Sequence, residues 1–291
     1  MQIGMTMPTM VPDLHRCAIL DWARRIDRGP FATLAAGERI TFPNQEILVT
    51  MAAAAAVTER VRLAFTVIVL PLHSEVLMAK QLATLDVISA GRVTAGVGVG
   101  GREEDYRAVD ASFERRLGRM ERQVARMRRV WAGEPPFEGA APVGPAPIQP
   151  GGPELLAGSL MPSSIRRAAR WADGLAGFSF GPDPAEVAMG FEVARAAWKE
   201  QGRPRPPRLV TSCWFSLGDR GRDAMDAYVK RYLGIYGDDV AAGLARQCVT
   251  TSAAALKETV QRMAAIGADE LILVPTTGDP DEVDRVADLI G

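Results

Sequence analysis

The sequence predicts a single α/β domain over residues 1–291, folded as a closed (β/α)8 barrel, the TIM-barrel architecture with loop insertions. Apolar segments of strand length alternate with segments of helix length along the whole chain, and eight such pairs can be counted. Residues 58–106 show the pattern best, because two apolar strands bracket a helix and the second strand ends in a run of glycines. A doubly wound sheet usually has fewer strands and a glycine fingerprint after the first, where this chain reads MPTMVPD.

The first half of the chain supplies four strand and helix pairs. Pro8 closes the first strand, and the helix that follows carries Leu14, Ala18 and Trp22 on one face. The second helix is rich in alanine, whose small side chain allows close approach to a sheet. The expected strands cover residues 2–7, 31–36, 61–70 and 93–99, and the expected helices cover 13–26, 45–58, 74–89 and 113–131.

A segment rich in proline and glycine, residues 133–153, reads as a long loop before the second half of the pattern. We expect this loop, together with residues 235–251, to shape the ligand pocket. The remaining strands are expected at 154–157, 174–178, 209–215 and 270–274, and helices at 161–171, 184–201, 223–232, 238–247, 253–266 and 280–290.

Composition excludes several classes of function. The 34 Lys and Arg residues balance 35 Asp and Glu, so no charge excess points to nucleic acid or membrane partners. Two histidines and three widely separated cysteines form no metal-binding pattern and no disulfide framework. The amino terminus lacks the pattern of a signal peptide, and together these features predict a cytoplasmic protein.

Several long segments resemble the bacterial luciferase-like family. They read TERVRL, AKQLATLDVISAGR, GVGVGGREEDY, LLAGSLMPSSIRRAARWADG and ADELILVPTTGDP, and they occur in the order that the family has. The resemblance implies a barrel oxidoreductase that uses FMN or the deazaflavin coenzyme F420 for hydride transfer on a small organic substrate. Relatives whose second strand is similar to residues 30–45 are typical of arginine-rich actinobacteria, which favours the deazaflavin.

Three other functions remain open. With FMN the protein would be a luciferase-like monooxygenase, and without catalysis it would be a barrel that only binds a flavin or another ligand. A barrel lyase or aldolase would need a lysine at a strand end, whereas Lys80, Lys199, Lys230 and Lys257 all fall on expected helices. The resemblance also implies a homodimer, for which the alanine-rich residues 51–57 would suit the contact.

The resemblance assigns the expected cofactor contacts to the ends of strands three and four. Gly98 and Gly100 would let a planar ring approach the backbone, although tight packing in the barrel would also explain glycine there. Thr66, Val67 and Ile68 correspond to a strand that in the family often carries a non-proline cis peptide behind the ring. We expect that bond near Val67–Ile68, against the alternative of an ordinary buried strand.

A second set of expected cofactor contacts, Gly158, Ser159 and Leu160, follows strand five and precedes a helix. Free amides at a helix start bind phosphate, and in similar proteins this position holds the cofactor phosphate. Ser159 or Ser163 would alternatively be an ordinary helix cap. The nearby Arg166 and Arg167 would either help to neutralise the phosphate or face solvent.

The candidate catalytic residues are Glu38, Arg39 and His73. Many relatives carry Asp-His where this chain has Glu38 and Arg39. Arg39 cannot act as an acid at neutral pH but could hold an anionic substrate or a reduced ring. Glu38 could relay a proton or pair with Arg39, and a purely structural ion pair is equally consistent. His73, in the loop after strand three, is the better placed histidine for proton transfer, unless it is merely exposed.

Further side chains should reach the mouth of the barrel. Trp214 and Phe215 end strand seven, and Thr276 and Thr277 follow strand eight. Aromatic side chains there would line a pocket for a flat ring, although Trp214 would also fit the barrel core. Arg102 lies near the end of strand four, and the acidic residues after it read as a solvated loop.

Overall fold

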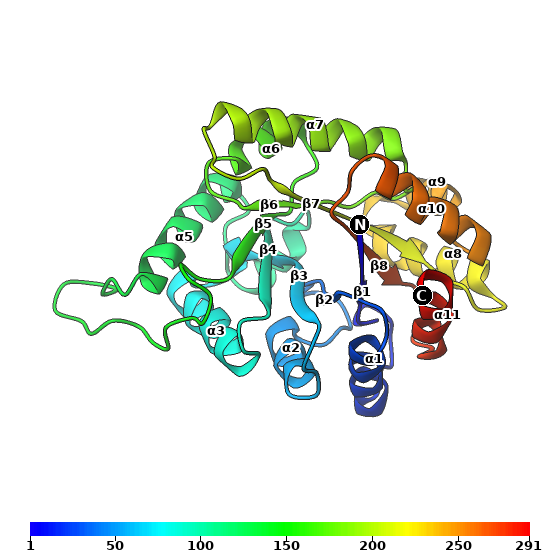
Figure 1. Ribbon diagram of the computed structural model, residues 1–291, viewed down its shortest axis with the longest axis horizontal. Helices are drawn as coiled ribbons and strands as arrows, with labels where there is room; N and C mark the ends of the chain where they lie inside the picture. The colour runs from blue at the N-terminus through cyan, green and yellow to red at the C-terminus, as the bar shows by residue number, and fades with distance from the viewer.

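The computed structural model describes residues 1–291, and its eight strands close into one parallel barrel (Figure 1). Each strand pairs with the next in sequence, and Gln2 to Met5 of the first strand pair with Glu270 to Leu273 of the last. This confirms the predicted fold class. The strands are β1 (Gln2–Thr6), β2 (Thr33–Ala36), β3 (Arg62–Val69), β4 (Val93–Gly98), β5 (Glu154–Ala157), β6 (Gly174–Ala176), β7 (Arg208–Phe215) and β8 (Glu270–Pro275).

Helices surround the barrel, and the expected ones are present with ends shifted by a few residues. They are α1 (Arg16–Arg28), α2 (Ile47–Ala55), α3 (Glu75–Ile88), α4 (Glu103–Ala108), α5 (Arg116–Trp131), α6 (Pro162–Ala168), α7 (Pro184–Glu200), α8 (Gly221–Leu233), α9 (Asp238–Gln247), α10 (Ala253–Ala265) and α11 (Asp281–Ile290), with short 3-10 turns η1 (Leu70–Leu72) and η2 (Gly234–Tyr236). None of these helices is both long enough and apolar enough to cross a membrane.

Helix α4 was not expected, because its sequence reads as solvated charge. Its first turn carries Glu103, Glu104 and Asp105, and negative charge stabilises the amino end of a helix. Asp105 and Tyr106 are buried, and the Tyr106 hydroxyl donates a hydrogen bond to the Val99 carbonyl at 2.5 Å. Glu103 and Glu104 are exposed, as expected of solvated charge, but they lie on a helix that buries Asp105, so the expectation of a loop is wrong.

Apolar side chains fill both the inside of the barrel and the layer under the helices. A small interior cluster takes Ala35, Ala64, Leu156, Ala176, Val210 and Ile272 from six strands. The larger core lies between strands and helices, where α1 buries Trp22, Ala23 and Ile26. This arrangement follows from parallel strands that are covered on both faces.

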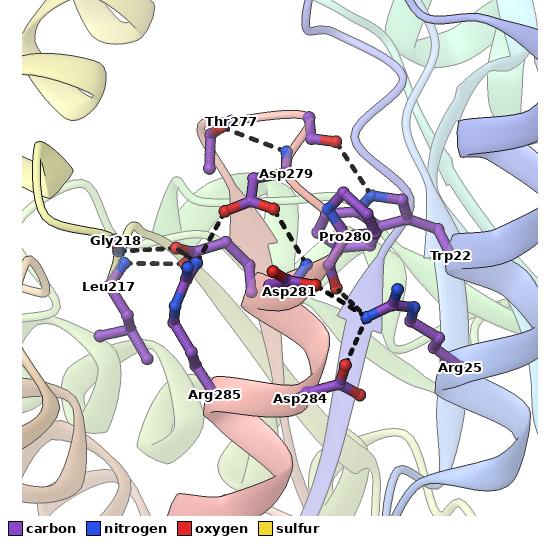
Figure 2. Close-up of polar contacts among 12 residues, drawn as sticks. Trp22, Arg25, Leu217, Gly218, Thr277, Asp279, Pro280, Asp281, Asp284 and Arg285 are labelled. Carbon is purple, nitrogen blue, oxygen red and sulfur yellow. Dashed lines mark hydrogen bonds and ion pairs between the residues drawn. The ribbon is translucent and has the colours of Figure 1, made fainter.

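Polar contacts dock the last helix against the first (Figure 2). Arg25 of α1 pairs with Asp281 at 3.1 Å and also with Asp284, both on α11. Trp22 reaches the loop after β8, where its indole nitrogen donates to the Gly278 carbonyl at 3.4 Å. These contacts bring the first and last βα units together outside the closed sheet.

The proline- and glycine-rich loop lies at the opposite end of the barrel from the expected site. It leads from α5 into β5, so it ends at the amino end of that strand, and it projects away from the barrel in Figure 1. Gln149 fastens its end, because its side-chain amide donates to Asp86 and to the Val93 carbonyl, both at 2.7 Å. The expectation that this loop shapes the ligand pocket is wrong.

Candidate active site

A cavity of about 280 Å³ opens at the carboxyl ends of the strands, where barrel enzymes carry their active sites. Its walls come from strand ends, from the loops after them, and from α8 and η2. The lining residues are Thr6, Met7, Pro8, Thr9, Met10, Gly37, Thr66, Val67, Arg102, Gly158, Leu160, Ala176, Gly177, Phe178, Phe180, Ser212, Trp214, Tyr228, Tyr232, Leu233, Tyr236, Val274 and Pro275. Apolar and aromatic side chains dominate this wall.

An irregularity in β3 forms one part of the wall. The peptide between Thr66 and Val67 is cis, and the pairing of β3 with β4 shifts register between Phe65 and Ile68. The cis bond therefore lies one peptide earlier than expected. Thr66 and Val67 line the cavity, whereas Ile68 is fully buried outside its lining.

The glycines of β4 pack against β3. A Cβ atom at Gly98 would lie 2.8 Å from a methyl of Val67, and one at Gly100 would lie 2.9 Å from a methyl of Val69. Neither glycine lines the cavity, so packing against β3 explains the missing side chain at Gly98, and Gly100 in addition has a left-handed backbone with a φ of +59°. Gly158 also leaves room for Val67, at 2.8 Å, and it does line the cavity.

The loop after β5 divides its residues between two spaces. Leu160 is 54% exposed and lines the mouth cavity. Ser159 is buried and faces an adjoining space of about 50 Å³ beside Ile165 and Phe191, which Leu160 also lines. Met161 is the N-cap residue of α6 and no side chain caps the helix, so the serine-cap interpretation is wrong.

The two arginines of α6 differ in their surroundings. Arg167 pairs with Glu121 of α5 at 2.5 Å, which raises the pKa of the guanidinium. Arg166 is exposed and makes no ion pair. Neither arginine lines the cavity at the barrel mouth.

Glu38 and His73 form a pair behind the cavity wall. One Glu38 oxygen lies 2.9 Å from the His73 Nε2 atom, and the other accepts a hydrogen bond from the Val69 amide at 2.7 Å. Gln123 of α5 donates to the His73 carbonyl at 2.8 Å. Neither Glu38 nor His73 lines the cavity. The pair therefore ties the end of β2 to the turn after β3.

Arg39 does not pair with Glu38, so that interpretation is wrong. Its Nε atom donates to Asp105 of α4 at 3.1 Å, and both side chains are almost fully buried. Asp105 also accepts hydrogen bonds from the Thr41 amide at 2.7 Å and the Thr41 hydroxyl at 2.5 Å. Burial alone would raise the pKa of Asp105, but the bonds from Thr41 and the charge of Arg39 hold it below its usual value.

Arg102 stands at the cavity wall in front of this pair. Its Nη2 atom donates to the Tyr232 carbonyl at 2.6 Å, and its guanidinium carbon lies 4.6 Å from the centre of the Tyr232 ring. Burial lowers the pKa of Arg39, and the nearby charge of Arg102 lowers it further. The negative charge of Asp105 only partly offsets this decrease. A guanidinium nevertheless stays protonated at neutral pH, so both cations are permanent.

Aromatic side chains that the sequence did not single out make up another wall. Phe178 and Phe180 follow β6, and their ring centres lie 4.8 Å and 5.4 Å from that of Trp214. Tyr228 and Tyr232 of α8 lie 5.8 Å from the same indole. The expected Trp214 lines the cavity, whereas Phe215 is buried in the main core. The two tyrosines are four residues apart in the sequence, and this spacing alone could have indicated that they share one face of a helix.

The two threonines that follow β8, Thr276 and Thr277, lie outside the cavity lining. The Thr276 hydroxyl is buried and lies 3.3 Å from the Phe215 carbonyl, to which it donates. The Thr277 hydroxyl accepts from the Asp279 amide at 3.3 Å in the loop shown in Figure 2. The contribution of β8 to the cavity comes from Val274 and Pro275.

Comparison with known proteins confirms the family resemblance. The model of the family described as luciferase-like monooxygenase matches residues 1–289. The uncharacterized protein Rv0953c of Mycobacterium tuberculosis is 30% identical over 210 residues, which cover 63% of this chain and 73% of that protein.

Two solved structures share the fold but carry different coenzymes. An F420-dependent secondary alcohol dehydrogenase, in complex with an F420–acetone adduct, has a TM-score of 0.80 at 16% identity and covers 99% of this chain and 98% of its own. The oxygenating constituent of 3,6-diketocamphane monooxygenase from Pseudomonas putida, a type II Baeyer–Villiger monooxygenase in complex with FMN, has a TM-score of 0.74 at 17% identity, with 100% and 96% covered. At these identities the likeness shows the fold alone.

Proposed function

Since the chain belongs to the luciferase-like monooxygenase family, we propose that it is an oxidoreductase that binds a flavin or deazaflavin and supports hydride transfer on a small organic substrate. The observation that carries the proposal is the apolar and aromatic cavity at the carboxyl ends of the strands. Coenzyme F420 or FMN, when bound, supplies the hydride chemistry. The chain's own part is to bind, to orient and to exclude water.

The cavity wall fits a planar ring. Gly37, Gly158 and Gly177 present backbone without side chains, and Val67 offers apolar contact. A volume of about 280 Å³ lies just below the range of about 300 to 1,000 Å³ for ligand pockets, so it fits a ring system better than a whole coenzyme. Leu160, which is half exposed at the rim, would contact a further part of the coenzyme.

We favour F420 over FMN as the coenzyme. The support is the arginine-rich sequence, with its resemblance to actinobacterial proteins, and the mycobacterial relative; the solved neighbours do not decide, because one binds F420 and another FMN. FMN, which the Pseudomonas neighbour binds, would instead make the protein a monooxygenase. We also propose a homodimer through α2 and α3, because Val49 and Leu77 on these helices are 71% and 54% exposed.

The test is titration of the purified protein with F420 and with FMN, followed by quenching of coenzyme fluorescence. We expect micromolar affinity for one of the two coenzymes, and we expect that coenzyme to be F420. Thr66→Trp, which fills the cavity, should abolish the quenching, whereas Met189→Trp on the exposed face of α7 should preserve it. Circular dichroism checks that both variants fold. Binding of neither coenzyme to the unmodified protein would refute the proposal.

A further inference from the structure

Arg102 is the only charged side chain that lines the mouth cavity, and it has no ion-pair partner within 4.0 Å. Its Nε atom is buried and makes no hydrogen bond. We propose that Arg102, backed by Arg39, forms an anion-binding subsite that receives the carboxylate of an apolar or aromatic acid, the substrate class of this enzyme. The inference rests on the proposed function, because it names the substrate of the same site.

The structure holds Arg102 in place before any ligand arrives. The Tyr232 carbonyl and ring fix its guanidinium, as the distances of 2.6 Å and 4.6 Å show. Next to it, a Cβ atom at Gly101 would lie only 3.1 Å from the Tyr236 hydroxyl. The start of α4 therefore meets the α8–η2 segment closely over the cavity. A cation that is already oriented loses less conformational entropy when it binds an anion.

The positive charge at this wall is not balanced by the carboxylates around it. Asp105 is occupied by the Thr41 amide, the Thr41 hydroxyl and the Arg39 Nε atom. Glu38 is occupied by His73 and the Val69 amide. Arg39 is 7% exposed, and its Nη1 atom is buried without a partner.

Asp105 is thus the counter-charge of Arg39 alone, and the Arg102 guanidinium at the cavity wall has none. Unpaired charge in such surroundings is costly, and an anionic ligand reduces that cost. Arg39 lies behind the wall and acts through the field that it adds to that of Arg102. Its predicted role is to position and strengthen the subsite, whereas Arg102 makes the contact.

The rest of the cavity defines the other end of the ligand. Met10, Phe178, Trp214 and Tyr228 present apolar surface, and no acidic side chain lines the wall. A planar guanidinium suits a carboxylate, which it can bind through two parallel hydrogen bonds. The chemistry therefore points to a compact apolar or aromatic body that carries one carboxylate.

The experiment compares a matched acid and amide, trans-cinnamate and cinnamamide, by isothermal titration calorimetry at low ionic strength and pH 7.5. We expect cinnamate to bind at least tenfold more tightly than cinnamamide. Arg102→Gln should weaken cinnamate binding by tenfold to a hundredfold, as loss of a charged hydrogen bond does, and should change cinnamamide binding by less than threefold. Arg107→Gln removes the same charge from an exposed position of α4 and should change neither by more than twofold.

Equal affinity for acid and amide, or equal loss of both in Arg102→Gln, would overturn the proposal. A tenfold loss of F420 or FMN affinity in Arg102→Gln, with that coenzyme displacing cinnamate, would also overturn it, because the cation would then serve the coenzyme. A protein that binds neither coenzyme but keeps its preference for cinnamate would refute the proposed function while supporting the anion subsite.

Discussion

Replacement of Asp105 by asparagine tests how the mouth of the barrel is held together. The carboxylate is 4% exposed, and it connects α4 to the segment after β2 through Arg39 and Thr41. Asp105→Asn keeps the size of the side chain but removes its charge. The Arg39 guanidinium would then be buried without a counter-charge, and one of the Thr41 donors would face an amide group.

The expected cost follows from the burial of this pair. Breaking a buried ion pair by removing one partner costs about 3 to 5 kcal/mol. Unfolding entropy of about 2.1 cal/mol/K per residue gives about 0.6 kcal/mol/K for a chain of this length. A loss of 3 kcal/mol should therefore lower the melting temperature by about 5 °C.

The assay is thermal unfolding followed by circular dichroism at pH 7, with Asp110→Asn, an exposed acid just after α4, as the control. The folded-state pKa of Asp105 is lowered, so its contribution is present above the unfolded value of about 4. That contribution should fade as the pH falls below about 4 and through the folded pKa. A shift under about 1 °C at pH 7, or one that stays constant into the acid range, would refute the reasoning.

Two further predictions concern packing and thiol chemistry. Gly98→Ala places a methyl group 2.8 Å from a β3 valine methyl and should destabilise the fold by about 1 to 3 kcal/mol in chemical denaturation. Gly118→Ala inside α5 makes only an ordinary contact with the Arg122 guanidinium, at 3.7 Å, and should stabilise the fold by up to about 1 kcal/mol. Comparable losses in both variants would contradict the packing argument. Burial raises the pKa of Cys213 to about 12 and of Cys248 to about 11. At pH 8 a disulfide reagent should therefore rapidly modify only the exposed Cys17, whereas all three thiols should react in denaturant. Fast reaction of a second thiol in the folded protein would count against this burial.

The fold was predictable because it depends on periodicity over long stretches. Apolar strand segments that alternate with amphipathic helices leave few alternatives to a barrel, and even the bounds of β5 and α9 agree with the prediction. Helix α4 was missed because three consecutive acidic residues have no apolar period. Its stability depends on tertiary contacts of Asp105 and Tyr106, which a sequence pattern cannot reveal.

The sequence could predict which strand ends form the candidate site, but not which charged side chains pair with one another there. Thr66, Val67, Gly158 and Trp214 lie on the cavity wall because the topology puts strand ends there. Adjacent side chains of an extended chain point in opposite directions, which argues against a contact between neighbours such as Glu38 and Arg39. Their partners lie 35 and 66 residues away along the chain, at distances that only the folded structure shows.

The proline- and glycine-rich loop could have been placed correctly by topology alone. Every loop that leads from a helix into a parallel strand lies at the amino ends of the strands. Residues 133–153 precede β5, so they belong to that end whatever their composition. The cavity is instead shaped by segments that follow strands, such as Phe178–Phe180 and the α8–η2 region.

The choice of arginine at position 39 has an electrostatic consequence for the mouth. A histidine there would gain and lose its charge near neutral pH, whereas Arg39 and Arg102 stay charged, and Asp105 stays ionised above about pH 4. The affinity for cinnamate should therefore be flat between about pH 6 and pH 9, since the ligand is fully ionised over that range. Calorimetric titrations across this interval measure it. An affinity that changes more than threefold across this interval would contradict the reasoning.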